Sequence, residues 1–528
     1  MSFGNPIVYA IFAAFGAVAL VSGFRREEYL LYLLGFVVSF VGFNVHLAAT
    51  IYLSRVILAV VVLLLIAGRI RTDCLLSQHG KYLAFAFAIL LSQLISSAIA
   101  DDTFASWRIT GVYMFDLCVF LAVLCLGRAA QNVVTAIKIY GITVLLQALL
   151  GIYQVVGGAR DWLSWQSLFP QMQTVNDRTT GGFLYSGEYA LFRATGLFTA
   201  DVSHYAGFLA SGLVLIIVLK LKRKTVRGSI ASGAVAIVVL LALMLSLSRS
   251  GILTGLGVAV PLLAWALRRF GFGARRALKP IGIGFVLAGI GFIASGGKTA
   301  DNGIDIGSLW ATTITRFADL INAGNDPGES MSEHIRTRQL GLDAFVSSPL
   351  FGRGMGVNET PWYSERYDAY WAGSHSHHID ILGQSGLIGA GIQWLFMWCA
   401  IREMYVCVRS RRGTEEERLV MIGLMVSALS IVIGNLFYAY FISDFVWFLF
   451  GCGVAMSNGL MRDRVRAGDE RGEIRKGGIM RRVRAGSVAA GRPEIRENVA
   501  TDSCAEGTGG SQKCSDDRAA TINPFFKT

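Results

Sequence analysis

Hydrophobic runs recur along most of this chain at the length needed to cross a bilayer. Runs of about 17–23 apolar residues match a hydrocarbon core about 30 Å thick, which a helix of about 20 residues spans. A soluble core could not bury so many such runs, so we expect an all-α polytopic membrane protein with about 12–13 transmembrane helices. The expected spans are 6–24, 29–45, 50–68, 82–100, 111–127, 133–154, 204–219, 229–247, 251–267, 280–296, 387–403, 419–438 and 442–459.

Lys and Arg concentrate in the connections that follow the odd-numbered spans, which the positive-inside rule places in the cytoplasm. Two of the alternate, outer connections, 155–203 and 297–386, are far longer than a helix hairpin needs, so we expect them to carry function. Both are rich in aromatic residues, and we therefore expect ordered structure in them, partly helical in the second. The basic residues of the cytoplasmic connections include Arg25, Arg26, Arg69, Arg71, Lys81, Arg128, Lys220, Lys222, Arg268, Arg269, Arg275, Lys279, Arg409 and Arg411.

Composition agrees with this interpretation. Apolar residues make up 53% of the chain and charged residues only 16%, whereas soluble domains carry about 25% charged residues. The net charge of +12 comes from the cytoplasmic connections and the tail, so it does not argue for nucleic-acid binding. The first apolar run, Pro6 to Phe24, follows no Lys or Arg, and we expect a retained span rather than a signal peptide. None of the eight cysteines falls in either outer loop, so we expect no structural disulfide and no metal cluster.

The chain changes character near residue 460. We expect a transmembrane domain over 1–460 and a mostly disordered, basic, cytoplasmic tail over 461–528. The tail is charged and Gly-rich, and it repeats Arg-Val-Arg-Ala-Gly at 464–468 and 482–486. Its arginines favour contact with anionic membrane lipid, and we expect no catalytic role there.

Arg249 lies at the outer end of the eighth span, in the Ser- and Gly-rich segment 246–251. An arginine near a membrane boundary often only extends its guanidinium to water. On the outer side, however, the positive-inside bias disfavours an arginine that has no function. Because the neighbouring serines and glycine let hydroxyls and backbone approach closely, Arg249 is a candidate anion-binding residue.

A second group of cations lies in the outer loop 297–386. The sequence 334–347 predicts an amphipathic helix that ends before Pro349. On such a helix Arg336 and Arg338 point about 200° apart, so only one of them can face a given site. The other is then a solvated basic residue.

Three of the seven histidines, His375, His377 and His378, fall within four residues just before the eleventh span. Metal binding has to be considered, because imidazoles cluster in metal sites. However, adjacent histidines diverge on a helix, and neither an HExxH motif nor a Cys partner is present. A neutral imidazole acting as a general base fits this segment better.

The order of these motifs resembles the O-antigen ligase and polymerase superfamily. The resemblance covers roughly 190–400 and rests on Ser-Arg-x-Gly at 248–251, Pro-Leu-Phe-Gly-x-Gly at 349–354, and His-x-His-x-x-Asp-x-Leu at 375–382 before Gly-Leu-Ile-Gly. It implies an integral GT-C-type glycosyltransferase of the bacterial inner membrane, with its active site facing the periplasm. The donor would be a glycan on undecaprenyl diphosphate, used without a nucleotide sugar or an obligatory metal ion.

By position, the resemblance implies that Arg249 and Arg336 hold the donor diphosphate and that His375 activates the acceptor hydroxyl. Two departures bear on this assignment: Ser376 stands where many relatives carry Asn, and His334 stands where many carry the loop arginine. The second departure leaves Arg336 and Arg338 as rivals, of which we favour Arg336. The further candidates for substrate binding are Arg338, Arg193, His377, Trp362 and Trp371, although an interfacial aromatic girdle explains the tryptophans nearly as well.

The acceptor would distinguish two activities of this superfamily. A ligase uses lipid A-core and a polymerase uses another lipid-linked repeat, and no motif here identifies the acceptor. We place the ligase first, an O-antigen or exopolysaccharide polymerase second, and a lipid-linked glycan transporter or flippase third. Asp116 and Arg55 lie within expected spans, where ionisable residues often mark transport pathways, but the chain shows no matching second half.

Overall fold

The computed structural model is almost entirely helical in the part of the chain that it describes. Its contacts divide the chain into Met1–Arg466 and Ala467–Thr528, and all described residues belong to the first unit. Beyond Arg462, the predicted tail therefore lies outside the described residues. The described residues are 6–40, 44–46, 50–70, 73–158, 183–186, 189–192, 194–196, 202–221, 226–275, 278–279, 281–283, 329–357 and 373–462.

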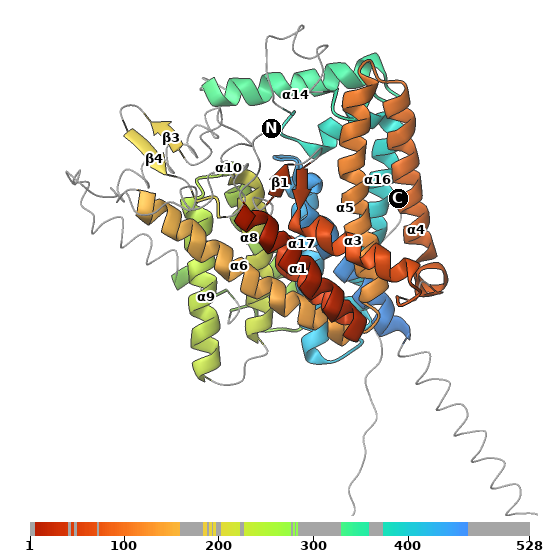
Figure 1. Cartoon of the computed structure of the whole chain (residues 1–528). Helices are drawn as coiled ribbons and strands as arrows, with labels where there is room; N and C mark the ends of the chain where they lie inside the picture. The colour runs from red at the N-terminus through yellow and green to blue at the C-terminus, as the bar shows by residue number, and fades with distance from the viewer. Residues whose placement is uncertain are drawn as a thin grey trace, which may run out of the picture. The chain divides into compact units, whose positions relative to one another are not determined.

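Long apolar helices form the body of the first unit (Figure 1). Short antiparallel strand pairs, β1 (Asn44–His46) with β2 (Thr50–Tyr52) and β3 (Phe183–Ser186) with β4 (Tyr189–Phe192), are its only strands within the described ranges. The helices are α1 (Pro6–Arg25), α2 (Glu28–Val37), α3 (Leu53–Ile66), α4 (Asp73–Ala98), α5 (Thr103–Leu126), α6 (Ala130–Gly158), α8 (Val202–Leu221), α9 (Val226–Leu245), α10 (Arg249–Ile252), the π-helix η2 (Leu253–Ala259), α11 (Val260–Arg269), α14 (Glu329–Ser347), α16 (His377–Arg409), α17 (Glu415–Gly434), the short 3₁₀ helix η4 (Tyr440–Ile442) and the helix Asp444–Arg462.

Seven helices among the described residues are long and apolar enough to cross a membrane. This confirms a multi-pass, α-helical membrane protein. The predicted total of 12–13 spans stays a prediction. The expected spans 6–24, 29–45, 50–68 and 229–247 coincide with shorter apolar helices, 387–403 lies in α16 outside the seven, and most of 280–296 lies outside the described residues. The seven candidate spans are Leu75–Ala98, Thr103–Leu126, Ala130–Val155, Val202–Leu221, Arg249–Arg269, Glu415–Gly434 and Asp444–Arg462.

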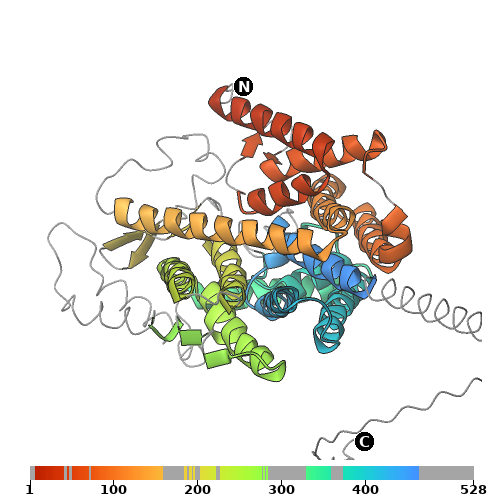
Figure 2. The ribbon, with the colours of Figure 1, turned by 90° about the horizontal axis from the view of Figure 1, so that it is seen from below.

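The helix α6 lies between the N-terminal helices and the α8–α9 pair (Figure 2). It packs against α2 on one side and against α8 and α9 on the other. The most enclosed candidate span is α8, with 89% of its apolar window buried. Because so little of α8 faces outward, its first turn is held by packing on several sides, and this turn carries residues of the candidate site.

At one end of the bundle, ion pairs and a hydrogen bond link the connections that are predicted to be cytoplasmic. Arg128 forms an ion pair with Glu27 at 2.8 Å, and the guanidinium of Arg462 donates to the Arg128 carbonyl at 3.4 Å. Lys138 likewise pairs with Glu416 at 2.8 Å. These contacts bring together chain segments that the charge parity assigns to the same side.

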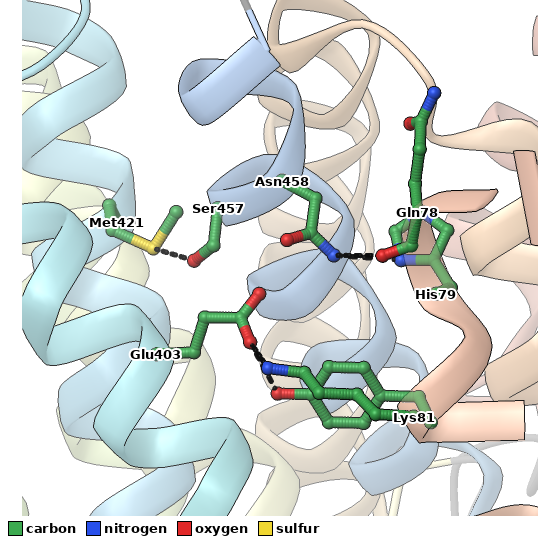
Figure 3. Close-up of polar contacts among 8 residues, drawn as sticks. Gln78, His79, Lys81, Glu403, Met421, Ser457 and Asn458 are labelled. Atoms are coloured by element: carbon green, nitrogen blue, oxygen red, sulfur yellow. Dashed lines mark hydrogen bonds and ion pairs between the residues drawn. The ribbon is translucent and has the colours of Figure 1, made fainter. Parts of the chain in front are cut away.

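A buried polar cluster ties α4, α16 and the helix Asp444–Arg462 together near the same end (Figure 3). The Glu403 carboxylate accepts hydrogen bonds from Lys81 and from the Tyr82 hydroxyl, the latter at 2.9 Å. The Asn458 amide lies 2.8 Å from the His79 imidazole. Glu403 and Tyr82 are buried, so their hydrogen bond fixes the position of α16 relative to α4. Apolar packing alone would specify this relative position only weakly.

Candidate functional site

Two sequence-distant motifs meet at the segment 435–440, which follows the end of α17. The span predicted to run to residue 438 ends as a helix at Gly434, and the chain turns there because the Asn435 side chain accepts from the Tyr440 amide at 2.8 Å. The Ser376 hydroxyl donates to the Asn435 carbonyl at 3.1 Å, and the Arg338 guanidinium donates to the next carbonyl, of Leu436, at 3.0 Å. The segment 435–440 is therefore the common partner of the histidine motif and of α14.

His375 is held in an unusual backbone conformation. Its φ of 51° lies in the left-handed region, which is sparsely populated by non-glycine residues and clusters at functional sites. The neighbouring Ser374 amide donates to the Asp380 carboxylate at 2.8 Å, and the Ser374 hydroxyl donates to the Ser376 carbonyl at 2.8 Å. These hydrogen bonds fix the loop, and the half-buried His375 ring lies with its centroid 5.7 Å from that of Tyr438.

Arg249 begins a helix that is anchored to the first turn of α8. Leu247, two residues earlier, also has a left-handed φ of 51° although it is buried. The Ser248 side chain caps the helix by accepting from the Gly251 amide, and its hydroxyl also contacts that of Ser203 at 3.2 Å. Added to Gly251, a Cβ would lie 2.1 Å from the Ala206 side chain, so the two helices touch here without room for a larger residue.

His204 connects the Arg249 segment with the His375 loop. It follows Ser203 on α8, and its ring nitrogen lies 3.1 Å from the Ala439 carbonyl. Its ring centroid is 5.1 Å from that of Tyr438, which also contacts His375. Tyr438 thus contacts both imidazoles, one from the α8 side and one from the α16 side.

The two arginines of α14 take different positions. The helix predicted over 334–347 is present within α14 and ends at Ser347, before Pro349. Arg338 is half-buried and donates to Leu436, whereas Arg336 is exposed. The sequence-based preference for Arg336 is therefore not supported by placement, since the bundle-facing side of α14 at this point is the side of Arg338.

A sharp kink at Gly386 divides α16 into two helical segments. Gly386 has a φ of 64° and a ψ of −168°, a conformation essentially restricted to glycine. The Trp394 indole donates to the His378 ring at 3.0 Å, although sixteen residues of straight helix would separate them by about 24 Å. The segment 377–385 is thus a separate helix and does not extend the part of α16 that carries the predicted span 387–403.

The turn at 349–354 fits into this kink. The Leu387 amide donates to the Pro349 carbonyl at 2.8 Å, and the Arg353 amide donates to the Gly383 carbonyl at 2.9 Å. A Cβ on Gly352 would lie 2.3 Å from the backbone of Gln384, so the glycine-rich turn is needed for close backbone contact. In Figure 1, α14, which leads into this turn, lies crosswise to α4 and α5 near their connection, and Arg353 pairs with Asp101 of that connection at 3.2 Å.

His377 lies in the protein interior, contrary to the expectation that it contacts substrate. Its side chain is fully buried and its ring is stacked on Phe441 with centroids 5.2 Å apart. Burial lowers the pKa of His377 to about 3, so this imidazole stays neutral at physiological pH. A glycan could not reach this ring without moving the surrounding helices, so the burial of His377 does not support its predicted contact with substrate.

The remaining predicted residues fall outside the described part of the chain. Arg193, Trp362 and Trp371 belong to this group, and their roles stay predictions. Within the described ranges, no group of three or more His, Cys, Asp or Glu residues could hold a metal ion. Sequence reasoning missed Asn435 and Tyr438, because the apolar run continues past Gly434 and hides the end of the helix.

The assembled groups suit an anionic ligand and a proton transfer. Arg338 supplies a half-buried cation, His375 supplies a partly accessible imidazole, and Arg249 emerges beside the same first turn of α8. Guanidinium groups bind phosphate oxygens through paired hydrogen bonds, and imidazole exchanges protons near neutral pH. Comparison with protein-family models finds no match, and comparison with curated proteins finds none either.

Proposed function

We propose that this protein transfers a glycan from undecaprenyl diphosphate to an acceptor hydroxyl on the periplasmic face of the bacterial inner membrane. The observation that supports this function is the convergence of Arg338, the His375 loop and His204 on residues 435–440. The Arg249 segment lies beside His204, because Ser248 contacts Ser203 in the first turn of α8. Arg249 is 89 residues before Arg338, and Arg338 is 37 residues before His375. The reaction class comes from the resemblance to the O-antigen ligases, and the geometry supplies residues suited to it.

The arginines would hold the diphosphate of the donor. Negative charge grows on this leaving group as the glycosidic bond breaks, and fixed guanidiniums stabilise that charge without a metal ion. Arg249 takes this role together with one arginine of α14. The resemblance assigns Arg336, whereas the contact of Arg338 with the Leu436 carbonyl favours Arg338. No cofactor is needed for this chemistry.

His375 would act as the general base. Its imidazole accepts the proton of the acceptor hydroxyl as the acceptor oxygen forms a bond to the anomeric carbon. The bond from that carbon to the diphosphate oxygen breaks, and its electron pair leaves on undecaprenyl diphosphate. Positioning supports this role, because the loop is held on both sides of His375 by Ser374, Ser376 and Asp380.

A reconstitution experiment tests the proposal. Purified protein in vesicles receives undecaprenyl-diphosphate-linked glycan with either lipid A-core or a second lipid-linked repeat, and no metal is added. His375→Ala and Arg249→Ala should each lose transfer by about 10²-fold or more. Arg25→Ala, which removes an exposed arginine at the opposite end of the bundle, is the matched control and should retain activity.

The product identifies the activity. Glycan on lipid A-core indicates a ligase, and longer lipid-linked chains indicate an O-antigen or exopolysaccharide polymerase with the same machinery. Normal activity in both site variants would refute the assignment of His375 and Arg249. Absence of product with both acceptors would refute glycan transfer to these acceptors.

A second candidate function, transport of a lipid-linked glycan, is favoured by one group of ionisable residues. Asp116 of α5 is buried beside Asp444 and Arg55, and the Ser54 hydroxyl donates to Asp444. The Arg55 guanidinium also lies 4.7 Å from the centroid of the Phe115 ring. Intramembrane charges of this kind often line transport pathways. Movement of a fluorescent lipid-linked glycan across vesicles that Asp116→Asn abolishes, with no transfer product, would favour transport over transfer.

A further inference from the structure

A cavity of about 660 Å³ lies at the end of the bundle opposite to the candidate site, where α11 ends and the chain turns back. Three cations, Arg268, Arg275 and Lys279, line it together with the apolar side chains of Leu278 and Ile283. This combination of a basic rim and an apolar wall matches a ligand that has an anionic head and a hydrocarbon body.

A second cavity of about 680 Å³ adjoins the first and shares Arg268 with it. Trp265, which is half exposed, and Arg269 also line this second cavity. Aromatic and basic side chains are the residue types that anchor at the boundary between membrane and water. The two cavities thus meet at Arg268, one beside the last turns of α11 and the other beside the segment that follows it.

Among the described residues, no acidic side chain pairs with the cations around these cavities. No described Asp or Glu lines either cavity, and none of the salt bridges between described residues includes Arg268, Arg269, Arg275 or Lys279. Lys220 at the end of α8 also lies close enough to Lys279 for their charges to repel. The positive-inside rule accounts for basic residues in this connection, but it does not account for their gathering around an apolar cavity.

The turn that forms the cavity is attached to the bundle. The Phe270 ring contacts that of Tyr405 in α16, with centroids 6.1 Å apart. Two residues later, Phe272 lies under the guanidinium of Arg418 in α17 at 5.1 Å. The cations are therefore presented by a fixed structure, so that a ligand bound there would contact several of them at once.

We propose that this cavity binds the phosphate headgroup of an anionic phospholipid, with the acyl chains against Leu278, Ile283 and Trp265. Basic pockets between membrane helices bind such headgroups, and each basic residue near an anionic surface contributes about five-fold in affinity. Removing three cations should therefore weaken binding by about 100-fold. The inference is independent of the proposed glycan transfer, because it concerns the other end of the bundle.

The test compares two triple variants of the full chain in detergent micelles. One variant, Arg268→Gln/Arg275→Gln/Lys279→Gln, removes the cations of the cavity, and bound phosphatidylglycerol is counted by native mass spectrometry. The matched control, Arg25→Gln/Arg69→Gln/Arg409→Gln, removes three exposed cations from the same end but outside the cavity. Cysteine labelling first establishes that both variants keep the wild-type topology. Loss of phosphatidylglycerol in the cavity variant alone is the expected result, and equal binding by the two variants would overturn the proposal.

Two further arms separate a lipid from a soluble anion. Phosphatidylcholine, which carries no net charge, should bind wild type no better than the cavity variant. Ile283→Ser should weaken phosphatidylglycerol binding while leaving any binding of inorganic phosphate unchanged. If inorganic phosphate binds at the cavity cations and phosphatidylglycerol does not, the site recognises a free anion and the lipid proposal fails.

Discussion

Replacing Gly386 by alanine should disrupt the candidate site through the backbone of α16. The His375 loop and the segment 377–385 are oriented by the kink at this residue, whose φ and ψ are 64° and −168°. Alanine cannot adopt this conformation without strain. Its Cβ would also lie 2.4 Å from the Leu350 carbonyl group and 2.6 Å from the Gly352 nitrogen. Because these contacts are with backbone atoms, no rotation of a side chain can relieve them.

The expected loss of stability follows from two contributions. Backbone strain of this kind costs about 1–3 kcal/mol. Moving the turn at 349–354 away would break the hydrogen bonds from Leu387 to Pro349 at 2.8 Å and from Ile388 to Leu350 at 3.2 Å. Each is worth about 0.5–1.5 kcal/mol net, so the total loss is on the order of 2–6 kcal/mol.

The assay measures thermal unfolding of the reconstituted protein and glycan transfer side by side. Gly391→Ala is the matched control, because this glycine lies in the same helix and an added Cβ there meets nothing within 4 Å. We expect Gly386→Ala to unfold several degrees lower than wild type and to lose transfer, and Gly391→Ala to change neither. If the two variants behave alike, the kink at Gly386 does not hold the site in place.

Three further predictions concern other parts of the bundle. Arg338→Gln should lower transfer by about 10²–10³-fold and Arg336→Gln by only a few-fold, measured as initial rates; the opposite order would return the role to Arg336. Burial raises the pKa of Asp380 to about 6, above its value of about 4 in an unfolded chain. The contribution of Asp380 to the free energy of unfolding is therefore greatest below pH 4 and falls as the pH rises through about 6. Asp380→Asn should therefore gain thermal stability relative to wild type at pH 7.5 but not at pH 4.5, and a difference independent of pH would contradict this. Tyr82→Phe should lose about 1–2 kcal/mol, because the buried Glu403 carboxylate loses a donor, and equal stability of this variant and wild type in urea unfolding would show that the hydrogen bond is not stabilising.

The arrangement of the site depends on contacts that no local pattern reveals. Sequence reasoning singled out Arg249, His375 and the helix around Arg338, because charged and polar residues stand out among apolar runs at the outer ends of spans. It favoured Arg336 over Arg338 from the resemblance, since helical periodicity places the two on opposite sides of the helix and does not show which side packs against the bundle. The inward placement of Arg338 depends on its contact with the Leu436 carbonyl, almost 100 residues later in the chain.

The sequence by itself determined the membrane class, the helical character and the positions of seven of the thirteen expected spans. These properties follow from the length of the apolar runs, since a helix satisfies its own backbone hydrogen bonds within lipid. The tertiary structure alone decided where α17 ends, how α16 bends at Gly386, and that His377 turns inward while His375 stays partly accessible. These features depend on backbone conformations and on partners distant in the sequence, and the pattern of hydrophobic and polar residues does not specify either.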